Sequence, residues 1–138
     1  MTKNCCRKEV VKTDQAPQPI GPYSAAVKGG HFLFTAGQIG IDPQTGEIVH
    51  GGVEAETRQV MKNISALLAA AGTGFERVVK TTIFLRDMND FAKVNAIYGE
   101  FFPKEPPARS TVQVAALPKG AAVEIEVIAL LAEDDSCC

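Results

Sequence analysis

The sequence predicts an α+β fold, a two-layer sandwich in which two helices cover one face of a mixed β-sheet. Two stretches carry apolar residues at three- and four-residue steps, and the other patterned segments alternate or are rich in β-branched residues, as strands are. In chain order these segments read β-β-β-α-β-α-β-β. A chain of 138 residues suffices for one core, so we expect a single domain at 9–132 between flexible tails at 1–8 and 133–138.

Three strands are predicted at the start of the domain. Two valines at 10–11 indicate a short opening strand, and segment 16–22 indicates an extended loop, because its prolines fix φ and lack an amide donor. Residues 23–27 and 31–36 indicate two further strands, joined in a tight hairpin around the glycine pair 29–30.

A turn and a long helix follow. Segment 42–46 has the chemistry of a turn, with Pro43 suited to the first corner and Gly46 free to adopt a positive φ. From 53 to 71 the apolar residues fall on one stripe and the charged residues elsewhere, which predicts an amphipathic helix. Gly72 is placed to end that helix in a left-handed conformation.

The second half of the domain predicts a strand, a helix and two more strands. Residues 77–85 are rich in β-branched side chains, and Asp87 or Asn89 is placed to cap the helix that follows. That helix carries Phe91, Val94, Tyr98 and Phe102, and Pro103 closes it. The last strands are expected at 109–115 and 121–131, with a turn at 117–120.

One face of the predicted sheet has no cover within a single chain. Residues 78–79 and 123–131 place apolar side chains on both sides of their strands, a pattern typical of sheets that are buried on both faces. Two helices cover only one face, so a monomer would expose a large apolar patch. We therefore expect the chain to self-associate.

Composition argues against several classes of function. The net charge is −2 and 22% of residues are charged, so nucleic acid and anionic membranes are not expected partners. No segment approaches the ~20 apolar residues that span a bilayer, and residues 1–12 lack the apolar run of a signal peptide. We expect a soluble cytoplasmic protein, or an organellar one if a presequence has been removed.

Four cysteines form adjacent pairs near the two ends of the chain: Cys5, Cys6, Cys137 and Cys138. Neither pair has the two-residue gap or neighbouring histidine of a zinc site, so no metal site is predicted. We expect reduced, mobile thiols. Disulfides between chains, capture of a soft metal, and addition of the cysteines by engineering are the alternatives.

The candidate chemistry is acid–base catalysis and anion binding, because the chain has no Gly-rich phosphate loop, no metal-ligand histidine pair and no nucleophile elbow. Arg109 follows a rigid proline-containing segment, where its planar fork suits a carboxylate; a surface arginine that packs its stem is the alternative. Glu124 and Glu126 share one face of an apolar strand as candidate acid–base groups. Solvated acids of an edge strand, or a salt bridge between subunits, would give the same pattern.

Three further side chains carry weaker signals. Tyr23 follows the bend at 21–22, where a loop can hold a phenol over a pocket, although a lone tyrosine usually belongs to the core. His31 and His50 lie beside glycines in expected turns, and we assign both to solvent.

Four ordered blocks of this sequence resemble the reactive-intermediate deaminase A family, also called the YjgF/YER057c/UK114 family. The blocks are IGPYS at 20–24; TAGQIG at 35–40 with DP at 42–43 and TGE at 45–47; VVKTT at 78–82 with NDF at 89–91 and VN at 94–95; and PAR at 107–109 with LPKG at 117–120 and VEIE at 123–126. The resemblance covers residues 20–129, nearly the whole domain. Any one block would be weak, but the ordered set is highly specific.

The resemblance implies a chorismate-mutase-like fold, assembled as a homotrimer with a cleft between each pair of subunits. It implies hydrolysis of 2-imino or enamine acids, the tautomers of 2-aminoacrylate and 2-aminocrotonate, to 2-keto acids and ammonia without a cofactor. Carried over by position, Arg109 resembles the residue that pairs with the substrate carboxylate, and Glu124 the residue that holds or activates the attacking water. The other substrate-binding positions implied are Tyr23, Gly37, Phe91, Asn95 and Thr111, the last through its backbone.

The chain departs from the family pattern at two positions of the expected cleft. Thr111 stands where many bacterial relatives carry Cys, a harmless change if only the backbone meets the ligand. Ala36 stands where Ser is frequent, which leaves the preferred imine open.

Two other classes of function compete with the enzyme. Members of the family have been linked to translation inhibition, RNA cleavage and chaperone-like action, so a non-catalytic binding protein or an RNA-directed ribonuclease is one alternative. A trimer scaffold engineered with terminal cysteine pairs is the other. The full set of Arg109, Glu124 and Tyr23 favours the enzyme, and the chain lacks an evident basic groove with stacking aromatics for RNA.

Overall fold

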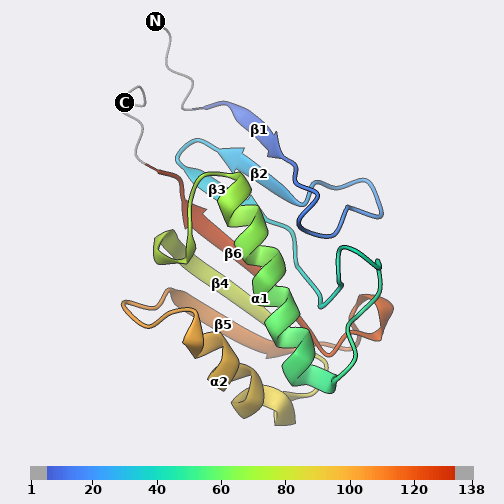
Figure 1. The fold of residues 1–138 in the computed structure, drawn as a ribbon. Coiled ribbons are helices and arrows are strands. Elements are labelled where there is room, and N and C mark those ends of the chain that lie inside the picture. Colours follow the sequence, from blue (N-terminus) through green and yellow to red (C-terminus); the bar gives the residue numbers. More distant parts are fainter. Residues whose placement is uncertain (1–5, 133–138) are drawn as a thin grey trace, which may run out of the picture.

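The order of strands and helices predicted from the sequence is confirmed. The structure, a computed structural model, describes residues 6–132 (Figure 1). Its strands are β1 (Lys8–Val11), β2 (Ala26–Gly29), β3 (Phe32–Thr35), β4 (Val78–Leu85), β5 (Ala108–Gln113) and β6 (Val123–Leu130). Its α-helices are α1 (Gly52–Ala70) and α2 (Phe91–Glu100), with 3-10 turns at Phe75–Arg77, Met88–Asp90 and Pro118–Gly120. The predicted tails fall largely outside the described residues, although β1 already begins at Lys8.

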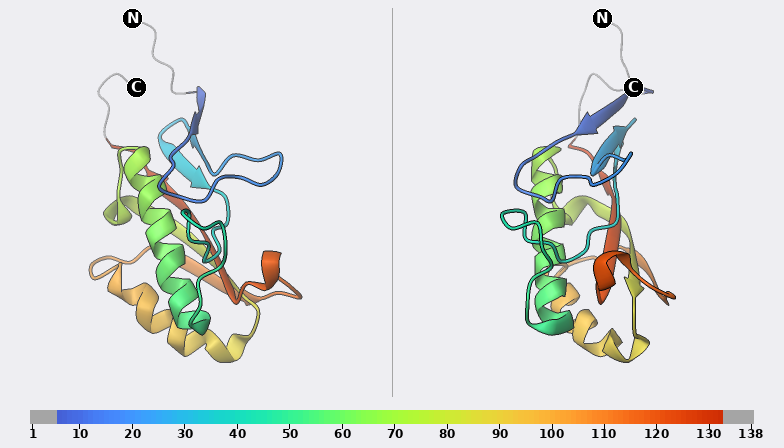
Figure 2. Two further views of the ribbon diagram at one scale, coloured as in Figure 1. Left: turned by 45° about the vertical axis from the view of Figure 1, so that its right-hand side comes forward. Right: turned by 90° about the vertical axis from the view of Figure 1, so that its right-hand side faces the viewer.

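The strands of the described chain form one mixed sheet in the order β1-β2-β3-β6-β4-β5. Only β4 and β5 pair in parallel; the other neighbouring pairs are antiparallel. A parallel pair needs a crossover, and α2 supplies it between β4 and β5. Both helices lie on the same side of the sheet, as the edge-on view in Figure 2 shows. The predicted two-layer α+β architecture is therefore confirmed.

The strand predicted at 23–27 begins later than expected. β2 starts at Ala26, which pairs with Thr35. Just before it, the Tyr23 amide donates to the Gly21 carbonyl at 2.8 Å, so the backbone makes a tight turn there instead of extending. The hairpin into β3 is tight, as predicted, and Gly30 supplies the positive φ of 60° that it needs.

Helix α1 packs one apolar stripe against the sheet and ends at a glycine. Its fully buried apolar residues include Val60, Met61, Ile64 and Leu67. Burying a side chain of this size contributes about 1.5–3 kcal/mol. At the C-terminal end, the Gly72 amide donates to Ala69 at 3.0 Å and the Thr73 amide to Leu68 at 2.9 Å, the two bonds of a Schellman motif. Gly72 has a φ of 80°, which confirms its predicted role.

Two polar side chains of α1 hold the backbone of loops at the end of the sheet. Asn63 is fully buried, and its amide nitrogen donates to the carbonyls of Ile39 at 3.2 Å and Ile41 at 2.9 Å. The carboxylate of the buried Glu56 accepts from the Ala122 amide at 2.8 Å. These bonds anchor the segment after β3, which carries the predicted site residue Gly37, and the segment that leads into β6, the strand of Glu124.

The helices also meet each other. Arg58 of α1 and Glu100 of α2 form two hydrogen bonds of 3.0 and 3.1 Å. Both side chains are more than half exposed, so this pair contributes little to stability. No helix within residues 6–132 has the length and apolar character to cross a membrane.

The sheet face away from the helices is partly apolar and uncovered. The β6 residues that project to this face are Glu124, Glu126, Ile128 and Leu130, as the alternation of the strand predicts. Beside them on β3, Phe32 and Phe34 are 38% and 45% exposed. The apolar face predicted from the sequence is present, and a face of this kind favours self-association.

Candidate functional site

Arg109 lies against two aromatic rings of α2. Its guanidinium carbon is 5.4 Å from the centroid of the Phe91 ring and 5.1 Å from that of the Tyr98 ring. These distances are within the range of cation–π attraction. One guanidinium nitrogen also donates a hydrogen bond to the side-chain oxygen of Asn95. The fold thus brings together three predicted site residues, Arg109, Phe91 and Asn95, and adds Tyr98.

Tyr98 belongs to a buried pair of hydroxyl groups. It is 5% exposed, and its hydroxyl lies 2.7 Å from that of Thr81, a fully buried residue of β4. Burial raises the pKa of Tyr98, and the bond with Thr81 and the charge of Arg109 offset part of that rise. The phenol is therefore neutral at physiological pH.

The sequence pattern assigns Tyr98 only to the apolar stripe of its helix and misses this role. A signal was nevertheless available. Phe91, Asn95 and Tyr98 follow one another at steps of four and three, which places them on one helix face.

Glu124 lies against the α-carbon of Gly37. It is half-buried on β6, and a methyl group added to Gly37 would lie 2.6 Å from its carboxyl carbon. Only glycine therefore admits this position of the carboxyl group. Burial raises the pKa of Glu124, and the negative charge of Glu126 raises it further. A raised pKa suits a carboxylate that must take up and release protons near neutral pH.

These two groups lie on opposite faces of the sheet. Arg109 pairs with Thr81, which pairs in turn with Val127, and the latter two are buried beneath the helices. Glu124 pairs with Phe84 in a row that projects to the other face. Residues of one cross-strand row point to the same side, and alternate rows point to opposite sides. A single chain therefore does not bring Arg109 and Glu124 into one cleft.

The remaining predicted contact residues are Thr111 and Tyr23. Thr111 follows Arg109 by two residues on β5 and points to the same side, and its hydroxyl oxygen is buried with no hydrogen-bond partner among the described residues. Tyr23 is 51% exposed in the loop before β2, and its hydroxyl accepts from the Ile20 amide at 3.4 Å. Thr111 thus extends the Arg109 group, whereas the place of Tyr23 in a cleft stays a prediction.

The histidines and cysteines do not join either group. His31 and His50 are exposed, as predicted. Across residues 6–132, no group of three or more His, Cys, Asp or Glu side chains is arranged to hold a metal ion. Cys6 is an exposed free thiol, and the predictions for Cys5, Cys137 and Cys138 lie outside the described residues.

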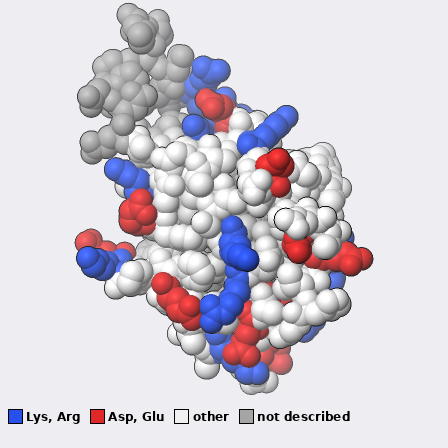
Figure 3. All heavy atoms as spheres, viewed as in Figure 1, with Lys and Arg blue, Asp and Glu red and all other residues white. Residues whose placement is uncertain are grey.

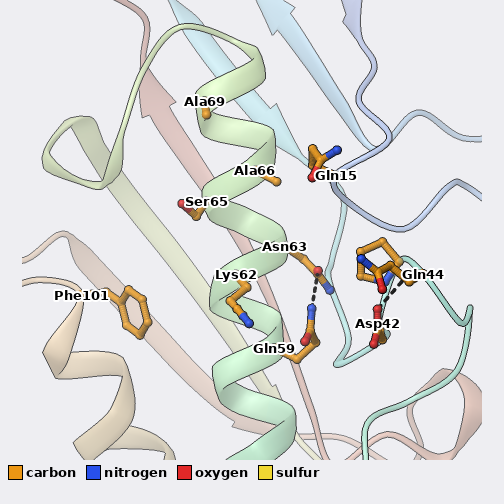
Figure 4. Close-up of a pocket in the computed structure, with 11 residues that line it drawn as sticks. Gln15, Asp42, Gln44, Gln59, Lys62, Asn63, Ser65, Ala66, Ala69 and Phe101 are labelled. Carbon is orange, nitrogen blue, oxygen red and sulfur yellow. Dashed lines mark hydrogen bonds between the residues drawn. The ribbon is translucent and has the colours of Figure 1, made fainter.

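A pocket of about 630 Å³ opens along the outer surface of α1 (Figure 4). None of the predicted site residues lines it. Its buried amide is already satisfied, because Asn63 accepts a 2.9 Å hydrogen bond from Gln59 and donates to two backbone carbonyls. Lys62 is the one cation and Asp42 the one acid among its lining residues. The pocket therefore lacks the acid–base and carboxylate-binding groups found on the sheet.

Comparison with known proteins points to one family. Residues 13–131 match the family model described as endoribonuclease L-PSP. The chain is 50% identical over 123 residues to the 2-iminobutanoate/2-iminopropanoate deaminase of Mus musculus, across 89% of this chain and 91% of that protein. It is 51% identical over 125 residues to the chloroplastic Reactive Intermediate Deaminase A of Arabidopsis thaliana, across 91% of this chain and 67% of that protein.

A solved structure shares the fold as well. The crystal structure of E. coli TdcF with bound serine is similar to this chain with a TM-score of 0.85 and 42% sequence identity. The match covers 90% of this chain and 99% of that one.

Proposed function

This chain belongs to the endoribonuclease L-PSP family, and from that membership we infer that it is a deaminase, which hydrolyses reactive 2-imino acids and their enamine tautomers to 2-keto acids and ammonia. The observation that carries the inference is the 50% identity, over 89% of this chain, to a mouse protein named for that reaction. The Arabidopsis relative bears a name of the same kind. We assign imines of the 2-aminoacrylate and 2-aminocrotonate type as substrates, with pyruvate and 2-ketobutyrate as products.

Arg109 binds the substrate carboxylate in this proposal. A guanidinium group presents donors in a fixed planar fork that matches the two oxygens of a carboxylate. One nitrogen of Arg109 is taken up by Asn95, and the other donors are left for a ligand. The E. coli relative holds serine, which is also a small acid with one carboxylate. Phe91 would form an apolar wall beside the bound acid.

Glu124 handles the protons. The oxygen of a water molecule forms a bond to the imine carbon, and the Glu124 carboxylate takes a proton from that water. As the carbon–nitrogen double bond opens, Glu124 passes this proton to the nitrogen, which gives a neutral carbinolamine. The carbinolamine hydroxyl then gives its proton to Glu124, the carbonyl forms as the carbon–nitrogen bond breaks, and the nitrogen takes that proton from Glu124 and leaves as ammonia. Burial and the charge of Glu126 make this carboxylate a stronger base by raising its pKa.

The complete site requires more than one chain in this proposal. Arg109 and Glu124 project from opposite faces of the sheet. Each chain therefore contributes Arg109 to one cleft and Glu124 to another, and a neighbouring chain completes each cleft. We propose a homotrimer in which the Arg109 group of one copy meets the Glu124 group of its neighbour. The exposed apolar side chains on the face that carries Glu124 support such a contact.

RNA cleavage is not favoured as a second function. The family description refers to an endoribonuclease, but the relatives with the reaction in their names are deaminases. On the face seen in Figure 3, acidic and basic side chains are interspersed and form no broad basic surface. RNA binding depends on such a surface.

The compartment belongs to the proposal as well. We assign the protein to the cytoplasm, with an organelle as the alternative, because the Arabidopsis relative is chloroplastic. Cell fractionation followed by immunoblotting decides between the two.

The test of the proposed reaction is ammonia or keto-acid release from freshly generated 2-aminocrotonate. The parent protein and Arg109→Ala are compared at equal concentration, and the spontaneous rate is subtracted. We expect the parent to accelerate release and the variant to lose at least about 100-fold of that acceleration, because the carboxylate is no longer held. Sedimentation analysis shows whether both proteins have the same assembly.

Two outcomes would count against the proposal. A correctly assembled trimer that gives no acceleration excludes the deaminase reaction for these imines. Parental activity in Arg109→Ala excludes Arg109 as the carboxylate-binding residue. RNA binding that survives Arg109→Ala and weakens with salt would favour the nucleic-acid function instead.

A further inference from the structure

We propose that Tyr98, held by Thr81, is a positioning residue for Arg109: it fixes the plane of the guanidinium group and, with it, the plane in which the substrate carboxylate binds. This assignment rests on the proposed function, because it extends the role of Arg109 in the same site. Tyr98 and Thr81 act through Arg109 and do not touch the reacting atoms.

The side chains that contact Arg109 differ in how firmly they are held. Phe91 is 37% exposed and Asn95 is also exposed, both at the outer edge of α2. Exposed side chains are less restrained than buried ones, although the hydrogen bond to Arg109 holds Asn95 in part. Tyr98 is 5% exposed, and its ring also packs 4.8 Å from the ring of Phe102. Of the three contacts, only Tyr98 presents a fixed surface.

Thr81 ties that surface to the sheet. The hydroxyls of Tyr98 and Thr81 lie 2.7 Å apart, and Thr81 is fully buried on β4. Thr81 is also the residue that pairs with Arg109 across the parallel strands β4 and β5. Thr81 therefore links the two parts of the site. Its backbone pairs with that of Arg109, and its hydroxyl bonds to the ring that lies against the Arg109 guanidinium group. The ring cannot tilt without breaking a buried hydrogen bond.

The consequence concerns the recognition of carboxylates. A cation attracted to the face of a ring is restrained relative to the ring plane. The hydrogen bond to Asn95 occupies one nitrogen and restrains rotation of the group within that plane. The free donors of Arg109 then form a preset edge that a planar carboxylate can meet with both oxygens. Arg109 is thereby organised before the substrate arrives, which lowers the entropic cost of binding.

The experiment compares Tyr98→Leu with Tyr98→Phe in the full-length protein. The KM and kcat for 2-aminocrotonate are measured together with the Kd for 2-ketobutyrate by calorimetry. Tyr98→Leu removes the ring, so we expect KM and Kd to rise roughly 2- to 30-fold, with a smaller change in kcat. Tyr98→Phe retains the ring but loses the hydroxyl bond to Thr81, so it should recover only part of that loss.

A second pair of variants tests the hydroxyl bond and does not depend on Tyr98→Leu folding. Thr81→Val leaves the buried hydroxyl of Tyr98 without its partner, and we expect it to weaken 2-ketobutyrate binding. Adding Tyr98→Phe to Thr81→Val removes both hydroxyls and should restore stability, because replacing both members of a buried pair is nearly neutral, but it should not restore binding, because the ring still lacks its bond to the sheet. A matched control is Ile97→Ala, which opens a cavity beside α2 at a buried residue that makes no ring contact with Arg109.

The outcomes separate this inference from the proposed function. If the parent neither turns over 2-aminocrotonate nor binds 2-ketobutyrate, the proposed function fails and the role of Tyr98 fails with it. If the parent is active and folded Tyr98→Leu keeps its KM and Kd, the positioning role alone is wrong. It is also wrong if Ile97→Ala weakens binding as much as Thr81→Val does, because loss of α2 stability would then explain both.

Discussion

Replacing Gly37 with alanine tests how closely the Glu124 carboxyl group is positioned. A methyl group on Gly37 would lie 2.6 Å from the carboxyl carbon and 2.8 Å from one carboxyl oxygen of Glu124. Ordinary contacts between such atoms are about 3.5–4.0 Å, so the carboxyl group must move by about 1 Å. A displacement of about 1 Å in a catalytic group lowers turnover by about 100-fold.

The structure also predicts that Gly37→Ala keeps its fold. Gly37 has no positive φ, so alanine fits its backbone conformation, and the group in the way is the end of a flexible side chain. We therefore expect kcat/KM for 2-aminocrotonate to fall by about 100-fold while the denaturant midpoint changes little. Gly99→Ala is the matched control, because a methyl group there meets nothing within 4 Å and should slightly stabilise α2.

A double variant shows whether Gly37 acts through Glu124. If it does, adding Gly37→Ala to Glu124→Gln leaves the residual rate of Glu124→Gln unchanged, because the carboxylate that Gly37 helps to position has already been replaced. The reasoning is refuted if Gly37→Ala turns over at the parental rate, or if the two losses multiply.

Two further predictions concern pH and stability. Glu124→Gln should lower turnover to a small residual rate and yet raise the urea midpoint near neutral pH. The raised pKa of Glu124 means that the folded state binds more protons than the unfolded state, so parental stability falls as pH rises from the ordinary glutamate pKa to the raised one. Urea titrations of both proteins across that range should converge at the acid end, and a gap that is constant with pH would contradict the assignment. Asn63→Ala removes the donor of the Ile41 carbonyl, whereas the Ile39 carbonyl still accepts from the Ile41 amide, so the unfolding free energy should fall by about 1–3 kcal/mol, measured by urea titration. Gln59→Ala, which removes only the bond to Asn63, is its control, and an equal loss in both variants would show that the carbonyl bonds contribute nothing.

Most of the fold could be predicted from local patterns in the sequence. The helix at 53–71 was visible because its apolar residues recur at helical steps, and it lies at Gly52–Ala70. The turn around Pro43 and Gly46 was visible because those residues have restricted or unusual φ angles. The strand predicted at 23–27 is present, but its predicted start was wrong, because a local hydrogen bond from the Tyr23 amide to the Gly21 carbonyl bends the backbone there.

Most residues of the candidate site could be predicted from the sequence, but their arrangement in space could not. Arg109 and Glu124 came from residue chemistry, strand position and family resemblance, and both project from the strands expected. Tyr98 was missed because, in an amphipathic helix, a tyrosine on the apolar stripe looks like any other core residue. Its hydroxyl partner Thr81 is 17 residues away, on a strand that only the folded sheet brings beside α2.

What the sequence determined by itself was therefore everything that depends on neighbours along the chain: the order of elements, the turns, the helix end at Gly72, and the face of β6 from which Glu124 projects. The tertiary structure alone decided which of these elements meet. Strand order and register place Arg109 against α2 and Glu124 against Gly37, on opposite faces of one sheet. The reason is physical, since side-chain periodicity reports the face of an element, whereas pairing between distant strands depends on long-range contacts that no local pattern records.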